Sequence, residues 1–94
     1  MGAYLRATPA LLDVVAVLRD TWPGETWGLA VCEASGRPTG TVYPLLERLE
    51  RHGLLSSRWE ADDVARRGPR RRLYRLTGTG TAWAGSKLNG RRQG

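Results

Sequence analysis

The sequence is poor in the residues on which most catalytic and metal sites depend. It holds one cysteine and one histidine among 94 residues, which excludes an internal disulfide and leaves no Cys–His cluster for zinc. It also lacks a glycine-rich phosphate loop and a recognisable Ser-His-Asp set. We therefore expect no enzymatic activity, no metal site and no cofactor.

Long apolar runs are lacking too. No stretch approaches the roughly 20 residues of a membrane span, and the N-terminus lacks the basic, apolar and small segments of a signal peptide. Together with the single cysteine, these absences predict a cytoplasmic protein with no membrane partner.

Acidic residues are scarce, and the charge is unevenly distributed. The formal net charge is +6. Residues 1–35 carry two arginines against four acidic residues, whereas residues 36–94 carry thirteen basic against five acidic residues. A surface charged only for solubility would not separate in this way. The basic part favours a polyanionic partner, most simply double-stranded DNA.

The strongest helical pattern lies between Thr39 and Gly53. Apolar residues recur at positions 42, 45, 46 and 49, which is the spacing of one helix face. Pro44 must lie in or beside the first turn, because a proline farther inside removes a hydrogen bond and clashes with the preceding turn. We expect Thr39 or Thr41 to be the N-cap and Gly53 to end the helix in the left-handed conformation.

Two further helices precede this one. Thr8-Pro9 is a typical helix start, and the residues up to Arg19 have a broad apolar face. Thr26 to Ala34 reads as a second short helix, followed by a loop that carries Arg37. Three helices in about fifty residues, the last two joined by a short glycine-containing turn, match the helix-turn-helix pattern.

After Gly53 the apolar period changes from helical to two. The runs around 54–60 and 71–76 predict a β-hairpin with a long Gly-Pro-containing tip. Thr77 to Leu88 predicts a short final helix, capped at Thr77, that three glycines weaken. The predicted fold class is therefore α+β: a winged helix-turn-helix of three helices, a two-stranded β-hairpin wing and a short C-terminal helix. It forms one domain over residues 1–88, and residues 89–94 are expected to be a basic disordered tail.

Arginine is concentrated at the tip of the hairpin. Six of the ten residues from Arg66 to Arg75 are arginine. A run of charge is usually a solvated face, but this run follows a helix-turn-helix directly, and Gly68-Pro69 holds the tip extended. The pattern favours contact of the wing, residues 61–72, with the DNA backbone or minor groove.

Several isolated polar and aromatic residues are expected to have structural roles and not functional ones. His52, at a helix C-terminus, is expected to interact with the helix dipole or solvent. Cys32 is expected to be a small core residue and not a redox sensor. Trp27 and Trp59 are expected to pack in the core or at its edge.

Three segments resemble a known family: GRPTGTVYPLLERLERHGLL, then SRWE, then RRGPRRRLYRLTGTG. They are similar to the PadR (phenolic acid decarboxylase regulator) transcription factors. The recognition helix of that family reads Gly-Thr-aliphatic-Tyr-Pro-x-Leu-x-x-Leu, and its wing returns through an Arg-Pro-Arg-type segment into Tyr-x-Leu-Thr. The resemblance runs from about residue 27 to residue 80. It implies a dimeric repressor of a dyad-symmetric operator, with Thr41, Tyr43 and Pro44 at the DNA surface.

The resemblance also bears on ligands and assembly. Some family members bind flat aromatic ligands between tryptophans at the dimer interface, which makes Trp83 a candidate ligand residue; nothing else supports a small-molecule effector. In the family a long C-terminal helix builds the dimer, whereas glycines interrupt the corresponding segment here. We expect a homodimer formed jointly by the short C-terminal helix and the N-terminal helix, whose apolar face is Leu11, Leu12, Val14, Val15 and Leu18, with Tyr4 and Leu5 reaching across.

Two functions fit these features. The first is a DNA-binding transcriptional regulator, a repressor that places the helix 40–52 in the major groove. The alternative is a winged-helix interaction or accessory module that binds DNA nonspecifically, favoured by the excess of arginine and by the lack of Asn or Gln on the helix to pair with adenine. The expected DNA-contacting residues are Arg37, Thr39, Thr41, Tyr43, Pro44, Glu47, Arg48, Arg66, Arg67, Arg70, Arg71 and Arg72.

Overall fold

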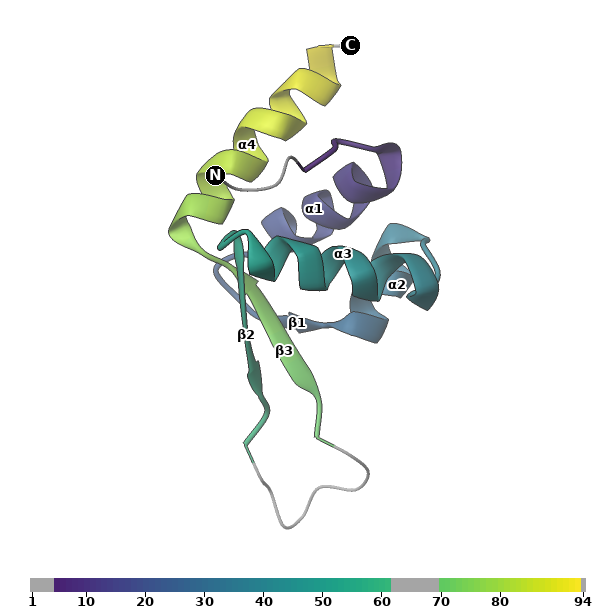
Figure 1. Ribbon diagram of the computed structural model, residues 1–94, viewed down its shortest axis with the longest axis vertical. Helices are drawn as coiled ribbons and strands as arrows, with labels where there is room; N and C mark the ends of the chain where they lie inside the picture. The colour runs from purple at the N-terminus through teal and green to yellow at the C-terminus, as the bar shows by residue number, and fades with distance from the viewer. Residues whose placement is uncertain (1–4, 62–69, 94) are drawn as a thin grey trace.

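The protein is a winged helix-turn-helix, as the sequence predicts. A computed structural model describes residues 5–61 and 70–93, with side chains up to residue 90. The elements in this part of the chain are α1 (Pro9–Thr21), β1 (Thr26–Trp27), α2 (Gly28–Ser35), α3 (Thr39–Arg51), β2 (Leu55–Trp59), β3 (Arg72–Leu76) and α4 (Gly78–Gln93). The hairpin β2–β3 extends from one end of the body and α4 rises from the other (Figure 1). None of the helices in these residues is long and apolar enough to cross a membrane.

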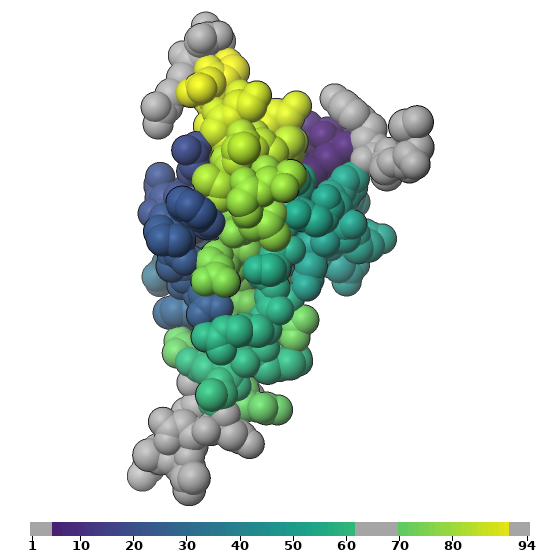
Figure 2. All heavy atoms as spheres, turned by 90° about the vertical axis from the view of Figure 1, so that its left-hand side faces the viewer, coloured from purple at the N-terminus to yellow at the C-terminus, as the bar shows by residue number. Residues whose placement is uncertain are grey.

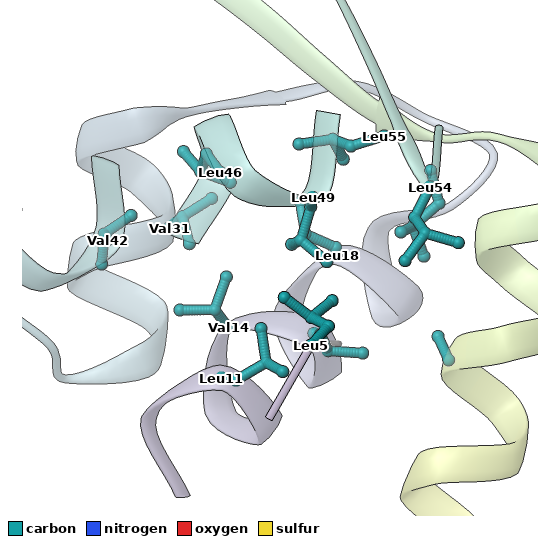
Figure 3. Packing of buried hydrophobic residues seen from close by; sticks show 13 residues of the cluster. Leu5, Leu11, Val14, Leu18, Val31, Val42, Leu46, Leu49, Leu54 and Leu55 are labelled. Carbon is teal, nitrogen blue, oxygen red and sulfur yellow. The ribbon is translucent and has the colours of Figure 1, made fainter. Parts of the chain in front are cut away.

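The core is built between α1 and α3. The stripe predicted on α3 is confirmed, because Val42, Leu46 and Leu49 are fully buried and Leu45 packs at the edge. α1 presents its own buried residues to this stripe, and Val31 of α2 closes one side (Figure 3). Each fully buried aliphatic side chain contributes about 1.5–3 kcal/mol, so this contact fixes which face of α3 is turned to the solvent.

Two helix starts were predicted correctly. The hydroxyl of Thr8 accepts a hydrogen bond from the Leu11 amide at 3.1 Å, with Pro9 in the first turn. The hydroxyl of Thr77 accepts one from the Gly80 amide at 2.9 Å, just before α4. At the end of α3, Gly53 has a φ of 74°, the left-handed value expected of it.

The start of α3 was predicted wrongly. Pro38 occupies the N-cap position, and no side chain caps the helix, so neither Thr39 nor Thr41 is the cap. Pro44 lies inside the helix, one turn farther in than expected. Position 44 has no amide to bond the Gly40 carbonyl, but both residues are exposed. Water can hydrate this carbonyl, and Gly40 has no side chain to crowd the proline ring, which lowers the cost of the proline here.

A third strand was missed at the beginning of α2. Thr26 and Trp27, which the sequence assigned to the second helix, form β1 and pair antiparallel with Tyr74 and Leu73 of β3. The sheet order is β1-β3-β2. Two residues are too few to show a period of two, so only the long-range pairing with β3 reveals this strand.

The end of the chain is more helical than predicted. α4 continues to Gln93, so residues 89–93, expected to be a disordered tail, are helical. One of the glycines expected to weaken α4 permits close packing, because a Cβ at Gly80 would overlap the carbonyl of Leu54. A Cβ at Gly85 would meet only the movable end of the Arg19 side chain, 2.7 Å from Nη1. A helix-propensity scale counts a glycine only as destabilising the helix, and it does not include the close approach of another segment that a glycine allows.

The apolar face of the N-terminal helix is not a spare surface. Leu11, Val14, Val15 and Leu18 are all buried in the core of the same chain, and Leu12 is half-buried. Leu5, expected to reach a partner, packs in this core as well, and Tyr4 lies outside the described residues. The prediction that this face helps to form a dimer assumed that part of it is left over from the core, and that assumption is wrong. By contrast, the C-terminal end of α4 projects from the body (Figure 2).

A packed glycine and an open glycine in α4 predict opposite effects of alanine substitution on the free energy of unfolding. Gly80→Ala should destabilise the fold by about 1–3 kcal/mol, since the backbone of Leu54 must move to admit the methyl group. Gly90, also in α4, has open space where a Cβ would lie, and Gly90→Ala should stabilise by up to about 1 kcal/mol. Urea unfolding measures both. Equal effects would show that packing against Leu54 does not require the glycine.

Candidate nucleic-acid interface

One carboxylate of α3 holds the hairpin against the recognition helix. Glu50 accepts a hydrogen bond from the Ser57 hydroxyl of β2 at 2.5 Å and lies 3.9 Å from Nη2 of Arg72 in β3. In the register Ser57 pairs with Tyr74, and Trp59 pairs with Arg72. These four residues share the face of the hairpin turned toward α3. Burial of Tyr74 on this face raises its pKa.

The solvent face of α3 carries four of the side chains predicted to contact DNA. Pro44, Glu47 and Arg48 are exposed, and Thr41 is half-buried. Glu47 and Arg51 approach to 3.8 Å, but both side chains are at least two-thirds exposed, so this ion pair adds little stability. The described residues of this face are therefore accessible to a partner.

Tyr43 has a fixed place at the side of this face. Its ring lies so close to Gly28, at the start of α2, that a Cβ there would overlap the ring. The side chain is nevertheless 41% exposed. The absence of a side chain at Gly28 thus leaves room for the phenol ring beside the start of α2, and the ring still remains partly exposed.

The arginines at the base of the wing are held by carboxylates and indole rings. Arg71 donates from Nε and Nη2 to the two carboxylate oxygens of Glu60, each at 3.1 Å, and its guanidinium lies 4.1 Å from the centre of the Trp27 ring. The hydrogen-bonded carboxylate raises the pKa of Arg71. Arg72 lies 5.1 Å from the centre of the Trp59 ring. Both cations are therefore oriented before any partner binds.

Other arginines have structural partners away from this face. Arg37 donates from Nε at 3.0 Å and Nη2 at 2.8 Å to Oδ2 of Asp13, which fastens the loop before α3 to α1. Arg58, not singled out from the sequence, donates to both carboxylate oxygens of Glu25. The Arg58 guanidinium lowers the pKa of that carboxyl. Both contacts join segments far apart in the chain, so no local pattern could reveal them.

A groove opens where α2, α3 and the hairpin meet. It encloses about 340 Å³ and is lined by Trp27, Gly28, Leu29, Tyr43, Trp59, Arg70, Arg71 and Arg72. Trp59 was expected to pack in or beside the core, but it is 56% exposed and lines this groove. The sequence did not reveal the register of the hairpin. Because Trp59 pairs with Arg72, both residues lie on the part of the hairpin that extends beyond the core.

The remaining predicted positions are more scattered. Thr39 is exposed at the first turn of α3, and Arg66 and Arg67 lie outside the described residues. Trp83 is half-buried and packs against the core. A second cavity, of about 620 Å³ between α1 and α4, has lining residues that include Arg19, Trp22 and Thr81 but not Trp83. Within residues 5–61 and 70–93, no group of three His, Cys, Asp or Glu could hold a metal ion.

Comparison with known proteins identifies relatives in family and in fold. A family model described as "Transcriptional regulator PadR-like family" matches residues 30–85. A PadR family transcription regulator from Clostridium difficile superposes with a TM-score of 0.73 at 22% identity, covering 90% of this chain and 88% of the other. A transcriptional regulator homologue from Pyrococcus horikoshii gives 0.70 at 19% identity, with 92% and 79% covered.

One structural relative is more similar in sequence. BpsR of Bordetella bronchiseptica superposes with a TM-score of 0.70 at 30% identity and covers 95% of this chain. The chain spans 61% of the length of BpsR. No curated protein sequence matches the chain significantly.

The tie between α3 and the hairpin predicts unequal effects of two glutamates on one helix. Glu50→Ala should destabilise the fold by about 1 kcal/mol and speed amide exchange in β2 and β3, because it removes the acceptor of Ser57 and the carboxylate beside Arg72. Glu47→Ala is the matched control, expected to change stability by less than about 0.5 kcal/mol. Urea unfolding with hydrogen exchange measures both. Equal exchange in the two variants would mean that Glu50 does not hold the hairpin.

Proposed function

Because the chain belongs to the transcriptional regulator PadR-like family, whose members are regulators and not enzymes, we propose that it represses transcription by binding an operator through α3 and the wing. The observation that carries this proposal is the joint placement of two surfaces. Glu50 holds the arginine-bearing face of the hairpin beside the accessible face of α3. A duplex can therefore meet both at once.

In this proposal α3 lies in the major groove. Tyr43, Glu47 and Arg48 are exposed on it, and two of them have defined preferences for base edges. Arginine bonds the O6 and N7 atoms of guanine, and glutamate accepts from the N4 amino group of cytosine. This supports readout centred on G·C pairs, with Thr41 and Pro44 near the start of the helix contacting the duplex alongside.

The wing supplies charge in this proposal. Arg70 and Arg71 lie just before β3, and Arg72 begins it. Arg71 and Arg72 are already oriented by indole rings. Contacts between arginine and phosphate position a protein on DNA without reading sequence. The neighbouring Arg66 and Arg67 would extend these contacts. Arg37 would act indirectly, by fixing the loop that leads into α3.

An operator with dyad symmetry requires two copies of α3, separated by about 34 Å. Homodimers are typical of the family. With the apolar face of α1 used inside the chain, the projecting α4 is the surface that we assign to the dimer. This replaces the joint interface expected from the sequence.

Selection of bound sites from randomised DNA, followed by competition, tests the function. Repression at an operator predicts one recurrent palindromic site, bound about 10³-fold or more tightly than random duplex of equal length, with two chains per site in sedimentation. The alternative, a winged-helix accessory module that binds DNA nonspecifically, predicts no recurrent site and equal competition by random DNA. That outcome would refute the operator.

Arg48 offers a sharper test of base reading. Arg48→Ala should weaken binding to the selected site by about 1–3 kcal/mol, and binding to random DNA by less, because a base contact is lost along with charge. The matched control is Arg6→Ala, which removes one positive charge from the exposed segment before α1, outside α3, the wing and α4. Fluorescence anisotropy at fixed salt compares the variants. Equal losses on both DNAs would make Arg48 a positioning contact, and an equal loss in the control would make the effect one of net charge.

A further inference from the structure

We propose that the groove between α2, α3 and the hairpin is a slot for the sugar–phosphate backbone of one DNA strand. In this slot, apolar and aromatic side chains contact the deoxyribose and arginines contact the flanking phosphates. The inference rests on the proposed DNA binding and names the part of the duplex that the groove takes. The strand lies between the major groove, which α3 occupies, and the groove that the wing reaches.

The first argument is the concentration of exposed apolar side chains. Four large hydrophobic residues are exposed in the described part of the chain: Trp22, Leu29, Tyr43 and Trp59. All except Trp22 line this groove, and Leu29 is 62% exposed. Single exposed apolar residues need no explanation, whereas a contiguous cluster rimmed by charge marks a binding surface.

The second argument is that each of two cations in the groove is paired with a ring. Arg71 stacks on Trp27 and Arg72 on Trp59, so each guanidinium lies beside an indole. A DNA strand likewise presents charge beside apolar surface, because an anionic phosphate lies between successive sugars whose C–H faces are apolar. Ionic and apolar contacts can therefore form together along a strand.

The third argument is continuity with α3. The ring of Tyr43 lines the groove and also borders the accessible face of the helix. With α3 in the major groove, the strand at the edge of that groove passes the side of the helix that Tyr43 occupies. The groove faces the hairpin on its other side, and the wing arginines there complete the contact.

The slot adds a contact that does not depend on salt. Phosphate contacts release condensed counterions, with a slope of about −0.9 per contact in log–log form, whereas burial of a leucine against a sugar releases none. Leu29→Ala should therefore weaken DNA binding by roughly fivefold at every salt concentration and leave the slope unchanged. Leu29 is too exposed for the change to impair folding, and circular dichroism confirms that it does not.

Tryptophan fluorescence gives a second readout. Trp22 and Trp59 are both exposed, but Trp22 lies outside the groove and donates from Nε1 to the Leu76 carbonyl. The expected DNA-induced change in fluorescence should persist in full in Trp22→Phe and be reduced in Trp59→Phe, where Trp27 is the remaining tryptophan of the groove. Persistence of the full change in Trp59→Phe would overturn the slot, and so would wild-type affinity of Leu29→Ala.

The controls separate this inference from the proposed function. If Arg48→Ala weakens binding to the selected site while Leu29→Ala does not, the function stands and the slot is refuted. If the wild-type chain selects no site, the proposed operator binding is refuted independently of the Leu29→Ala result. Sodium 2-naphthoate, a planar aromatic anion, is the competing occupant: saturable quenching of Trp59 by naphthoate, with no effect of Leu29→Ala on DNA binding, would make the groove a small-molecule site instead.

Discussion

Burial of one side of α3 determines the rest of this structure. Val42, Leu46 and Leu49 pack on α1, and a helix whose apolar stripe is fixed in this way has no freedom to turn. The same contact therefore chooses the outward face, with Glu47 and Arg48, and the lateral position of Glu50. A truncation such as Leu46→Ala in this contact would destabilise the fold by about 2–5 kcal/mol without altering any side chain of the exposed face.

Glu50 extends this order to the hairpin. The hairpin alone would be a marginal structure in water, since an isolated two-stranded sheet has little to bury. Here β1 pairs with its returning strand, Leu55 and Leu76 are buried in the core, and Glu50 binds Ser57. The base of the wing is thus part of the folded body, so the residues proposed to contact DNA there are held in fixed positions relative to α3.

The sequence predicted what depends on local pattern. The stripe of α3, the caps Thr8 and Thr77, and the left-handed Gly53 all follow from spacing or backbone chemistry within a few residues. The errors came from contacts distant in sequence. The strand β1 exists through pairing with β3, and Gly80 matters through the carbonyl of Leu54. The position of Pro44 is a local exception, because it depends on the exposure of Pro44 and Gly40 to solvent. In the site, the exposed positions of α3 were foreseen, but the groove was not, because it unites three segments that no periodicity connects.

The stacking of arginine on tryptophan at the wing has a thermodynamic consequence. A free arginine side chain loses up to about 1.5–2 kcal/mol of rotamer entropy when it is immobilised. Arg71 and Arg72 already lie against Trp27 and Trp59, so much of that loss occurs during folding. Association then orders fewer bonds, which favours a smaller entropic penalty on binding than the same charges would incur on a flexible tail. The entropy of binding, obtained from the affinity and the heat of binding, would therefore reflect this arrangement, whereas the number of arginines would not.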